Sequence, residues 1–243
     1  MTAHPPGPRL PPPTRMLGWL AVAGAAVVAV LDLLVAVHWA PLLDLDQTIV
    51  ATAHTAVLAQ PWLLVAAQVV TAIGSPVAVD VVTAVAAVVL LIGRRWRATV
   101  LLVVARFGEL ACETGLKELL GRARPHFADP VAVASGYSFP SGHTAGTAAG
   151  YGALVLLALP LVARHWRPLL LGTGVALTAA VAASRVLLGV HYPSDVTAGA
   201  ALGVVWIAVA AFLASRALPA TTLSRFAHLG PRAERNRPRN HDQ

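Results

Sequence analysis

The sequence between residues 184 and 195 reads Ser184-Arg185-Val186-Leu187-Leu188-Gly189-Val190-His191-Tyr192-Pro193-Ser194-Asp195. This stretch joins two long apolar runs, so its ionisable residues stand where a membrane helix reaches water. Ionisable groups at the edge of the hydrocarbon are costly and are usually retained for a function. His191 and Asp195 are four residues apart, a spacing that lets the carboxylate hold one ring nitrogen and leave the other free. The pattern indicates that His191 is a nucleophile or a base.

The composition of the whole chain indicates an integral membrane protein. Of its 243 residues, 57% are hydrophobic and only 12% are charged, and the mean hydropathy is +0.69. A soluble domain carries about 25% charged residues. The single cysteine, Cys112, lies inside an apolar run, which excludes an intramolecular disulfide and a cysteine-rich metal site. Many of the arginines behind the net charge of +7 lie in tails and short loops. We therefore interpret the charge as a signal of topology and of anionic membrane lipids, and we expect no nucleic-acid partner.

The apolar runs divide the chain into four parts. We expect a disordered cytoplasmic tail at residues 1–15, N-terminal transmembrane helices at residues 16–96, a membrane domain that carries the motifs at residues 97–215, and a basic cytoplasmic tail at residues 216–243. The predicted spans cover residues 16–40, 76–93, 98–120, 140–163, 169–183 and 196–214. The sequence therefore predicts an all-α polytopic membrane bundle of about six transmembrane helices.

Basic residues indicate the orientation of these helices. Residues 94–97 and 164–167 form basic loops, which favour the cytoplasm, whereas residues 41–60 contain no lysine or arginine and suit an outer loop. Six crossings with both termini in the cytoplasm satisfy all of these loops. Residues 54–75 leave two alternatives open, a separate span or an interfacial helix, and the parity of the basic loops favours one helix out and one helix back.

Charged residues inside the span at residues 98–120 are spaced for pairing. Arg106 and Glu109 are three residues apart, and Glu113 and Lys117 are four apart, so each acid can pair with a base on one helix face. We interpret Arg106 and Glu109 as a structural ion pair in the interior of the bundle.

Two further motifs lie at the ends of predicted spans. The first reads Lys117-Glu118-Leu119-Leu120-Gly121-Arg122-Ala123-Arg124-Pro125, and its lysine is the only one in the chain. The second reads Tyr137-Ser138-Phe139-Pro140-Ser141-Gly142-His143-Thr144. Ser141 can cap the helix that follows, and the free N–H groups and dipole of that helix form a site for an anion. Gly142 allows a ligand to approach the backbone closely.

All three motifs are expected on one surface of the membrane. No span separates the first from the second, and about two spans separate His143 from His191, so the chain returns to the same side. Together the motifs supply a helix N-terminus, two histidines and the cations Lys117, Arg124 and Arg185. Phosphoryl transfer needs these parts: fixed positive charge around the phosphoryl oxygens, a nucleophile in line, and an acid for the leaving oxygen.

In this order the motifs Lys-x6-Arg-Pro, Pro-Ser-Gly-His and Ser-Arg-x5-His-x3-Asp resemble those of the type 2 phosphatidic acid phosphatase (PAP2) family, whose active site is similar to that of vanadium haloperoxidases. The resemblance covers about residues 97–215, and every motif position is occupied. It implies a PAP2-like catalytic membrane domain in which His191 forms a phosphohistidine, Asp195 orients His191, and His143 protonates the leaving alkoxide. It also implies a phosphate-binding set that consists of Lys117, Arg124, Ser141, Gly142 and Arg185.

The resemblance implies a membrane-embedded phosphatase that hydrolyses a phosphomonoester or diphosphate of a lipid, of the phosphatidic acid or prenyl diphosphate type. The predicted topology puts its active site on the extracytoplasmic face of the cell membrane. Two alternatives stay open: a phosphotransferase that uses the same phosphohistidine, and a non-catalytic protein that binds or transports lipid phosphates. The complete set of two histidines and one aspartate argues against the second alternative, because binding alone needs only the cations.

No metal and no other cofactor is expected, because the only acids in the motifs are Glu118 and Asp195, too few for a magnesium site. The expected partners are the lipid phosphate substrate and membrane lipids. The motifs address only the phosphate, so they leave open which lipid carries it, and they leave open the oligomeric state. Arg122 has two alternative roles, a contact with substrate or with a lipid headgroup. We interpret His126 as an interfacial histidine.

Overall fold

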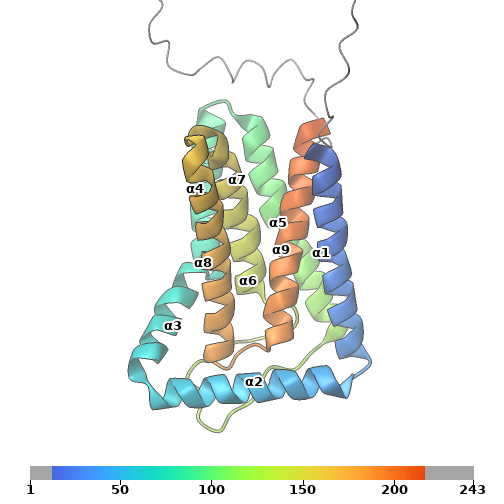
Figure 1. Ribbon diagram of the computed structural model, residues 1–243, viewed down its shortest axis with the longest axis vertical. Helices are drawn as coiled ribbons and strands as arrows, with labels where there is room; N and C mark the ends of the chain where they lie inside the picture. The colour runs from blue at the N-terminus through green and yellow to red at the C-terminus, as the bar shows by residue number, and fades with distance from the viewer. Residues whose placement is uncertain (1–12, 217–243) are drawn as a thin grey trace, which may run out of the picture.

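The computed structural model describes residues 13–216, which form a bundle of helices with one helix lying across its end (Figure 1). The helices are α1 (Pro13–Ala36), α2 (Ala40–Ala59), α3 (Pro61–Ile73), α4 (Pro76–Ile92), α5 (Trp96–Leu120), α6 (Gly142–Gly146), α7 (Gly152–Ala158), α8 (Arg167–Leu187) and α9 (Pro193–Arg216). A π-helical turn, Thr147–Tyr151, joins α6 to α7, and two 3-10 turns, Leu159–Leu161 and Arg164–Trp166, lie between α7 and α8. No strand occurs within residues 13–216, and the predicted all-α membrane bundle is confirmed.

The predicted tails lie almost entirely outside the described residues. The exceptions are residues 13–15, which begin α1, and residue 216, which ends α9. Proline is tolerated in the first turn of a helix, because the N–H that it lacks would have no partner there. The tail predicted for residues 1–15 is therefore wrong at residues 13–15. The rest of it, and residues 217–243, lie outside the described residues.

Among the described residues, five helical segments are long and apolar enough to cross a membrane: Arg15–Ala36, Pro61–Ile92, Gly142–Leu161, Arg164–Leu187 and Pro193–Leu213. Each corresponds to one of the six predicted spans. The remaining predicted span is α5, whose 25 residues run beside the others through the bundle (Figure 1). Its charged residues lower its hydropathy, so its place in the bundle depends on how those charges are paired.

Four charged residues of α5 are paired inside the bundle. Arg106 lies between two acids, with Nη1 2.5 Å from Glu109 Oε2 and Nε 2.8 Å from Asp80 Oδ1 on α4. Further along α5, Lys117 Nζ lies 3.2 Å from Glu113 Oε1. Both pairings that the spacing predicts are confirmed. An unpaired charge inside hydrocarbon is costly, so these pairs allow α5 to run among apolar helices.

Residues 41–60, expected as an outer loop, instead belong to α2, which lies across one end of the bundle (Figure 1). The buried side chains of α2 recur every three or four residues, as one face of a helix requires; they are Asp46, Val50, His54 and Val57. Two of these four are polar, which interrupts the apolar pattern that would otherwise indicate an amphipathic helix.

Gly74 and Ser75 divide the next apolar stretch into α3 and α4. α3 leaves the end of α2 obliquely (Figure 1), and its 13 residues extend about 20 Å, too short for a hydrocarbon core of about 30 Å. Ser75 Oγ accepts a hydrogen bond from Ala78 N and so caps α4. Residues 54–75 thus comprise the end of α2 and the whole of α3, and they do not form a span of their own.

Glycines on α9 bring it against the backbone of the Gly142–Leu161 segment. A Cβ on Gly199 would collide with the carbonyl oxygen of Ser141, and a Cβ on Gly203 would collide with Ala148. Small residues at such crossings let helix backbones approach closely. In addition, Ser141 N donates to the carbonyl oxygen of Asp195 at 3.0 Å. This packing places the Pro-Ser-Gly-His motif beside the start of α9.

Candidate active site

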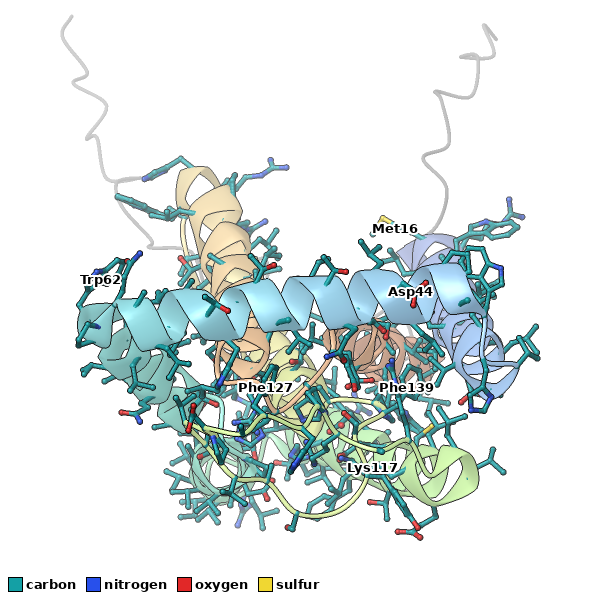
Figure 2. All side chains as sticks on the ribbon, turned by 90° about the horizontal axis from the view of Figure 1, so that it is seen from below. Met16, Asp44, Trp62, Lys117, Phe127 and Phe139 are labelled. Carbon is teal, nitrogen blue, oxygen red and sulfur yellow. The ribbon has the colours of Figure 1, made fainter. Side chains whose placement is uncertain are left out.

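The three motifs meet at the end of the bundle that α2 crosses. Lys117 lies in the last turn of α5, His143 in the first turn of α6, and His191 between α8 and α9. Figure 2 looks at this end and shows Phe127 and Phe139 beside α2, with Lys117 farther from that helix. Lys117 Nζ of the first motif donates to Tyr137 O of the second, and Arg124 Nη1 of the first motif donates to Val190 O of the third. The structure therefore brings residues of all three motifs within electrostatic reach of one another.

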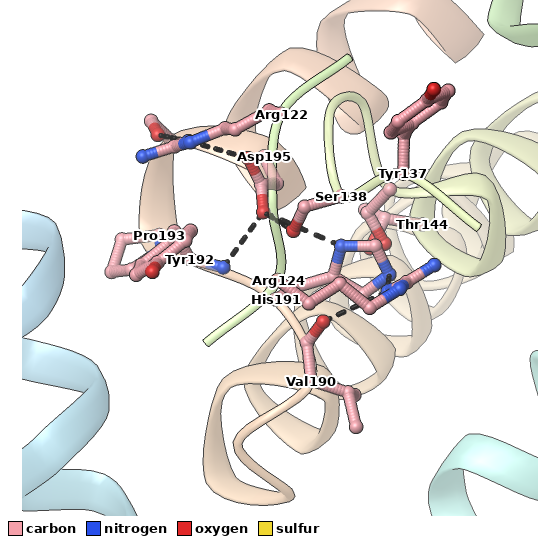
Figure 3. Close-up of polar contacts among 12 residues, drawn as sticks. Arg122, Arg124, Tyr137, Ser138, Thr144, Val190, His191, Tyr192, Pro193 and Asp195 are labelled. Atoms are coloured by element: carbon pink, nitrogen blue, oxygen red, sulfur yellow. Dashed lines mark hydrogen bonds and ion pairs between the residues drawn. The ribbon is translucent and has the colours of Figure 1, made fainter. Parts of the chain in front are cut away.

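His191 is buried and lies between an acid and a cation (Figure 3). Its Nδ1 is 3.4 Å from Asp195 Oδ2, an ion-pair distance that is longer than an ordinary hydrogen bond, and its Nε2 is 2.9 Å from Arg124 Nη1. A guanidinium can only donate, so we assign the lone pair to Nε2 and the proton to Nδ1, which faces Asp195. The ring nitrogen that carries the lone pair, Nε2, is therefore the one turned away from Asp195.

The environment of His191 keeps its ring neutral. Burial lowers the pKa of the His191 imidazole to about 4, against the charge of the nearby Asp195, while the charges of Arg124 and Arg185 act in the same direction as burial. An ordinary histidine has a pKa of about 6.5. The ring is therefore uncharged at pH 7, as a nucleophilic imidazole must be.

The end of α8 fixes the backbone just before His191. Gly189 adopts the left-handed conformation with φ of 68°, which glycine enters without steric cost. Gly189 N donates to Val186 O at 3.0 Å, and Val190 N donates to Arg185 O at 3.2 Å. These two bonds form a Schellman motif, which stops α8 sharply and sets the direction in which His191 leaves the helix.

The start of α9 fixes Asp195 in the same way. α9 begins at Pro193, a residue favoured at the first helical position. Tyr192 N donates to Asp195 Oδ2 at 2.8 Å, which is the backward-reaching bond of a capping box. His191 is consequently held between two helix ends, and its acid partner stands in the first turn of the second helix.

Arg124 links the motifs through backbone carbonyl groups. Its Nε donates to Gly136 O at 3.0 Å, its Nη2 to Ser135 O at 3.0 Å, and its Nη1 to Val190 O at 2.8 Å. The first two acceptors lie in the loop before the second motif, and the third lies next to His191. Arg124 is therefore held beside His191 by contacts within the protein.

Lys117 and Arg185 are anchored more lightly. Besides its ion pair with Glu113, Lys117 donates from Nζ to Tyr137 O at 3.1 Å. Arg185 donates from Nη1 to Thr71 Oγ1 on α3 at 2.9 Å, and its buried Nε has no hydrogen-bond partner among the described residues. Arg185 thus keeps a buried donor that can bind an anion.

The second motif differs in two details from its expected structure. Ser141 stands at the N-cap position of α6, but its side chain makes no hydrogen bond to a backbone N–H, because its Oγ is engaged as the acceptor of Thr144 Oγ1 at 3.2 Å. The prediction that Ser141 caps the helix is therefore wrong. A Cβ on Gly142 would collide with the Glu113 carboxylate. The position that a Cβ would take is consequently occupied by an acid, and the role of Gly142 in ligand binding stays a prediction.

Sequence reasoning missed the residues that surround Asp195. Arg122 Nη1 and Ser138 Oγ both donate to its carboxylate, the first at 2.5 Å (Figure 3). Arg122 Nη2 also donates to Asp46 Oδ2 on α2 at 2.8 Å. Arg122 is thus buried among acids of the protein, and neither of its two expected roles describes these contacts. The helical period of α2, which turns Asp46 inward, is the one sequence signal that could have found Asp46.

His126 lines a hollow of about 340 Å³ beside the candidate site, together with Arg124, Val190 and mostly apolar residues. Its assignment as an interfacial histidine stays a prediction. Within the part of the chain that the structure describes, no group of three or more histidine, cysteine, aspartate or glutamate side chains is placed to hold a metal ion.

Comparison with known proteins extends these observations. A family model described as "PAP2 superfamily" matches residues 98–218. The chain is 31% identical over 177 residues to phosphatidylglycerophosphatase B of Bacillus subtilis (strain 168), an alignment that covers 71% of this chain and 85% of the relative. It is 40% identical over 94 residues to the decaprenylphosphoryl-5-phosphoribose phosphatase of Mycobacterium tuberculosis, with 36% of this chain and 45% of the relative covered.

A solved structure shares the fold. It is the crystal structure of a transmembrane PAP2 type phosphatidylglycerolphosphate phosphatase from Bacillus subtilis, which superimposes with a TM-score of 0.75 at 23% identity. The superposition covers 83% of this chain and 99% of that chain.

Proposed function

The chain belongs to the PAP2 superfamily, whose phosphatases are metal-independent lipid phosphate hydrolases, and from this premise we propose that it hydrolyses a membrane lipid phosphate through a phosphohistidine at His191. The observation that carries the proposal is the row formed by Arg124, His191 and Asp195, in which Nε2 of the ring faces a cation and Nδ1 faces an acid. Such a row combines an oriented nucleophile with a group that binds phosphate oxygens.

In the first step, Nε2 of His191 attacks phosphorus and the bond from phosphorus to the lipid oxygen breaks. Arg124 Nη1, which donates to Nε2 in the structure, then donates to a phosphate oxygen instead. The ring becomes positively charged as the N–P bond forms, and the Asp195 carboxylate beside Nδ1 stabilises that charge. His143, which must enter this step protonated, gives a proton to the leaving lipid alkoxide and becomes neutral.

Fixed positive charge stabilises the phosphoryl group during transfer. Lys117, Arg124 and Arg185 each donate to oxygen acceptors of the protein, which hold the cations in place before the substrate arrives. Phosphoryl transfer depends mainly on positioning and electrostatic stabilisation, so preorganised cations lower its barrier directly. Gly142 would add a backbone N–H group, and Ser141 its side-chain hydroxyl, at the start of the Gly142–Leu161 segment.

In the second step, water attacks the phosphorus of the phosphohistidine. His143, now neutral, takes a proton from that water, the P–N bond breaks, and inorganic phosphate leaves. His191 returns to its neutral form with the proton on Nδ1, still facing Asp195. At the end of the cycle His143 is protonated again, His191 is neutral again, and the phosphoryl group has passed from the lipid to water.

A glycerolipid phosphomonoester is the substrate that the comparisons support best. The relative named phosphatidylglycerophosphatase B aligns over 85% of its own length, and the relative named for decaprenylphosphoryl-5-phosphoribose aligns over 45%. The longer alignment necessarily reaches beyond the motif region into the helices around the site, where the lipid part of a substrate would bind.

The site is proposed to face the extracytoplasmic side, with both termini in the cytoplasm. The connections from α4 to α5 and from α7 to α8, which carry the basic residues 94–97 and 164–167, lie at the end of the bundle away from α2 (Figure 1). α1 begins and α9 ends at this same end. The positive-inside rule assigns such an end to the cytoplasm.

Phosphate release by the purified protein tests this function. Phosphatidylglycerophosphate, phosphatidic acid and decaprenyl phosphate would be presented in mixed micelles, with the His191→Ala variant as the blank. We expect release by the wild type, strongest from the glycerolipids, and none by the variant. Equal release by His191→Ala would contradict the proposal, and transfer of the phosphoryl group to an added alcohol in preference to water would identify a phosphotransferase.

A further inference from the structure

The carboxylate of Asp195 is fully buried and is held by more donors than His191 alone. Oδ2 accepts from Ser138 Oγ and from Tyr192 N, and Oδ1 accepts from Arg122 Nη1 at 2.5 Å. His191 Nδ1, at 3.4 Å, is the most distant of the four donors. The orientation of Asp195 is therefore decided by groups other than the histidine that it serves.

Arg122 joins Asp195 to a second acid. Its Nη1 donates to Asp195 and to Ser194 Oγ, its Nη2 donates to Asp46, and its guanidinium carbon lies 4.2 Å from the ring centroid of Tyr192. The side chain is only 8% exposed. A planar guanidinium can make these forked and stacked contacts together, whereas an ammonium cannot.

Asp46 connects this cluster to the crosswise helix α2. Its side chain is 2% exposed; Oδ1 accepts from Ser194 N at 2.9 Å, and Oδ2 accepts from Arg122 Nη2 and from Ser194 Oγ. Ser194 N is one of the N–H groups in the first turn of α9 that no intrahelical carbonyl can satisfy. Asp46 therefore caps α9 from another helix and complements its dipole.

The cluster carries a charge that suits the intermediate. With all three side chains ionised, Asp46, Arg122 and Asp195 have one net negative charge. A buried net charge is costly unless a partner balances it. The neutral ring of His191 becomes positive when Nε2 binds phosphorus, so the cluster gains its balancing charge as the reaction proceeds, and it favours the charged ring over the neutral one.

We propose that Asp46 and Arg122 are positioning residues of the reaction, which hold Asp195 in place beside His191. Through Asp46, α2 thus contributes to the support of the active site. The inference rests on the proposed function, in which Asp195 serves a nucleophilic His191. Among the described residues, the side-chain hydrogen bonds of Arg122 go to Asp46, Ser194 and Asp195. Loss of either residue should consequently slow the chemical step and leave substrate binding nearly unchanged.

Arg122→Gln and Asp46→Asn test the proposal, each alone and each combined with Asp195→Asn. We expect each single variant to lower kcat about 10-fold to 100-fold, as loss of an outer partner of a functional histidine does at metal sites, while KM on a lipid phosphate changes by less than about twofold. In the Asp195→Asn background, neither change should lower kcat by more than about twofold, because both act through Asp195.

Glu109→Gln is the matched control, because Glu109 is fully buried and paired with Arg106, but belongs to no motif of the site. It should lower the melting temperature in detergent, and any loss of kcat should multiply with that of Asp195→Asn. The proposal would be overturned if the loss of kcat caused by Asp46→Asn or Arg122→Gln also multiplied with the loss caused by Asp195→Asn. It would also be overturned if either variant raised KM and left kcat unchanged.

A second Arg122 variant and the trapping of phosphohistidine distinguish a failure of this inference from a failure of the proposed function. Should Arg122→Gln not fold, Arg122→Lys keeps the charge without the fork, and we expect it to lower kcat with the same non-additivity; full activity of this variant would count against the proposal. Trapping of phosphohistidine at His191 in the wild type tests the proposed function independently. If phosphohistidine is trapped at His191 but the losses of kcat in the double variants multiply, only the roles of Asp46 and Arg122 are refuted.

Discussion

Arg124 Nη1 lies 2.9 Å from His191 Nε2, the nitrogen that attacks phosphorus in the proposed mechanism. In that mechanism, the cation proposed to bind phosphate thus covers the proposed nucleophile before the substrate is bound. The other hydrogen bonds of this guanidinium go to backbone carbonyl groups, and they can persist when Nη1 turns its donor to a phosphate oxygen. The proposed mechanism therefore couples binding of the phosphate to exposure of the nucleophile.

The lowered pKa of His191 predicts the pH dependence of the reaction. Attack requires the neutral ring, so activity is present above the pKa of about 4 and is lost as the pH falls through it. We expect an acid limb of kcat/KM near pH 4. A substrate phosphate titrates near pH 6, so profiles from two aryl phosphates with different phosphate pKa values would separate the two limbs. If both substrates gave an acid limb near the pKa of an ordinary histidine, about 6.5, the result would contradict a buried neutral ring at His191.

Replacement of His143 and replacement of His191 should have different effects on activity. His143 acts by proton transfer, which contributes about 100-fold to 10,000-fold, and an aryl leaving group needs less protonation than a lipid alkoxide. His143→Ala should therefore keep relatively more activity on an aryl phosphate than on a lipid phosphate, whereas His191→Ala should be inactive on both. Equal losses on the two substrates for His143→Ala would remove His143 from the role of acid.

The contact between α9 and the Gly142–Leu161 segment should be needed for activity. Gly199→Ala places a Cβ against the Ser141 carbonyl oxygen, and such overpacking costs about 1–3 kcal/mol. We expect a lower melting temperature in detergent and a lower kcat, because Asp195 moves with α9. Gly172→Ala on α8 is the control, since nothing lies within 4 Å of its added Cβ. Equal effects of the two changes would argue against close backbone packing at Gly199.

Single cysteines can establish the orientation. In a Cys112→Ala background, Ala128→Cys lies in the exposed loop between the first two motifs and His165→Cys lies in an exposed basic turn. An impermeant thiol reagent added to intact cells should label the first and not the second. Labelling of both from the same side would contradict the proposed topology.

Much of the bundle could be predicted because its signals are local. Apolar runs indicate spans, and the intervals from Arg106 to Glu109 and from Glu113 to Lys117 predicted ion pairs that the structure confirms. In contrast, α2 was missed, because Asp46 and His54 occupy inward positions where the helical pattern calls for apolar residues. Their burial is explained only by partners from distant segments, among them Arg122 for Asp46 and the Asp129 carbonyl for His54.

The candidate site could be assembled from its motifs, but its supporting contacts could not. Arg122 and Asp195 are 73 residues apart in the chain, and no periodicity relates residues at that distance. The hydrogen bond from Ser141 N to the Asp195 carbonyl oxygen likewise joins segments that are far apart in the chain. A motif thus predicts which groups act on phosphate, while the groups that hold them in position become visible only in three dimensions.

Identification of the phosphorylated residue tests the central claim most directly. Turnover of a lipid phosphate labelled in its phosphate group would be quenched in base, in which phosphohistidine persists, and the labelled peptide identified by mass spectrometry. We predict acid-labile label on His191, its absence in His191→Ala, and its accumulation in His143→Ala, in which hydrolysis of the intermediate is slowed. Label on His143, or turnover by the wild type without any phosphohistidine, would contradict the mechanism.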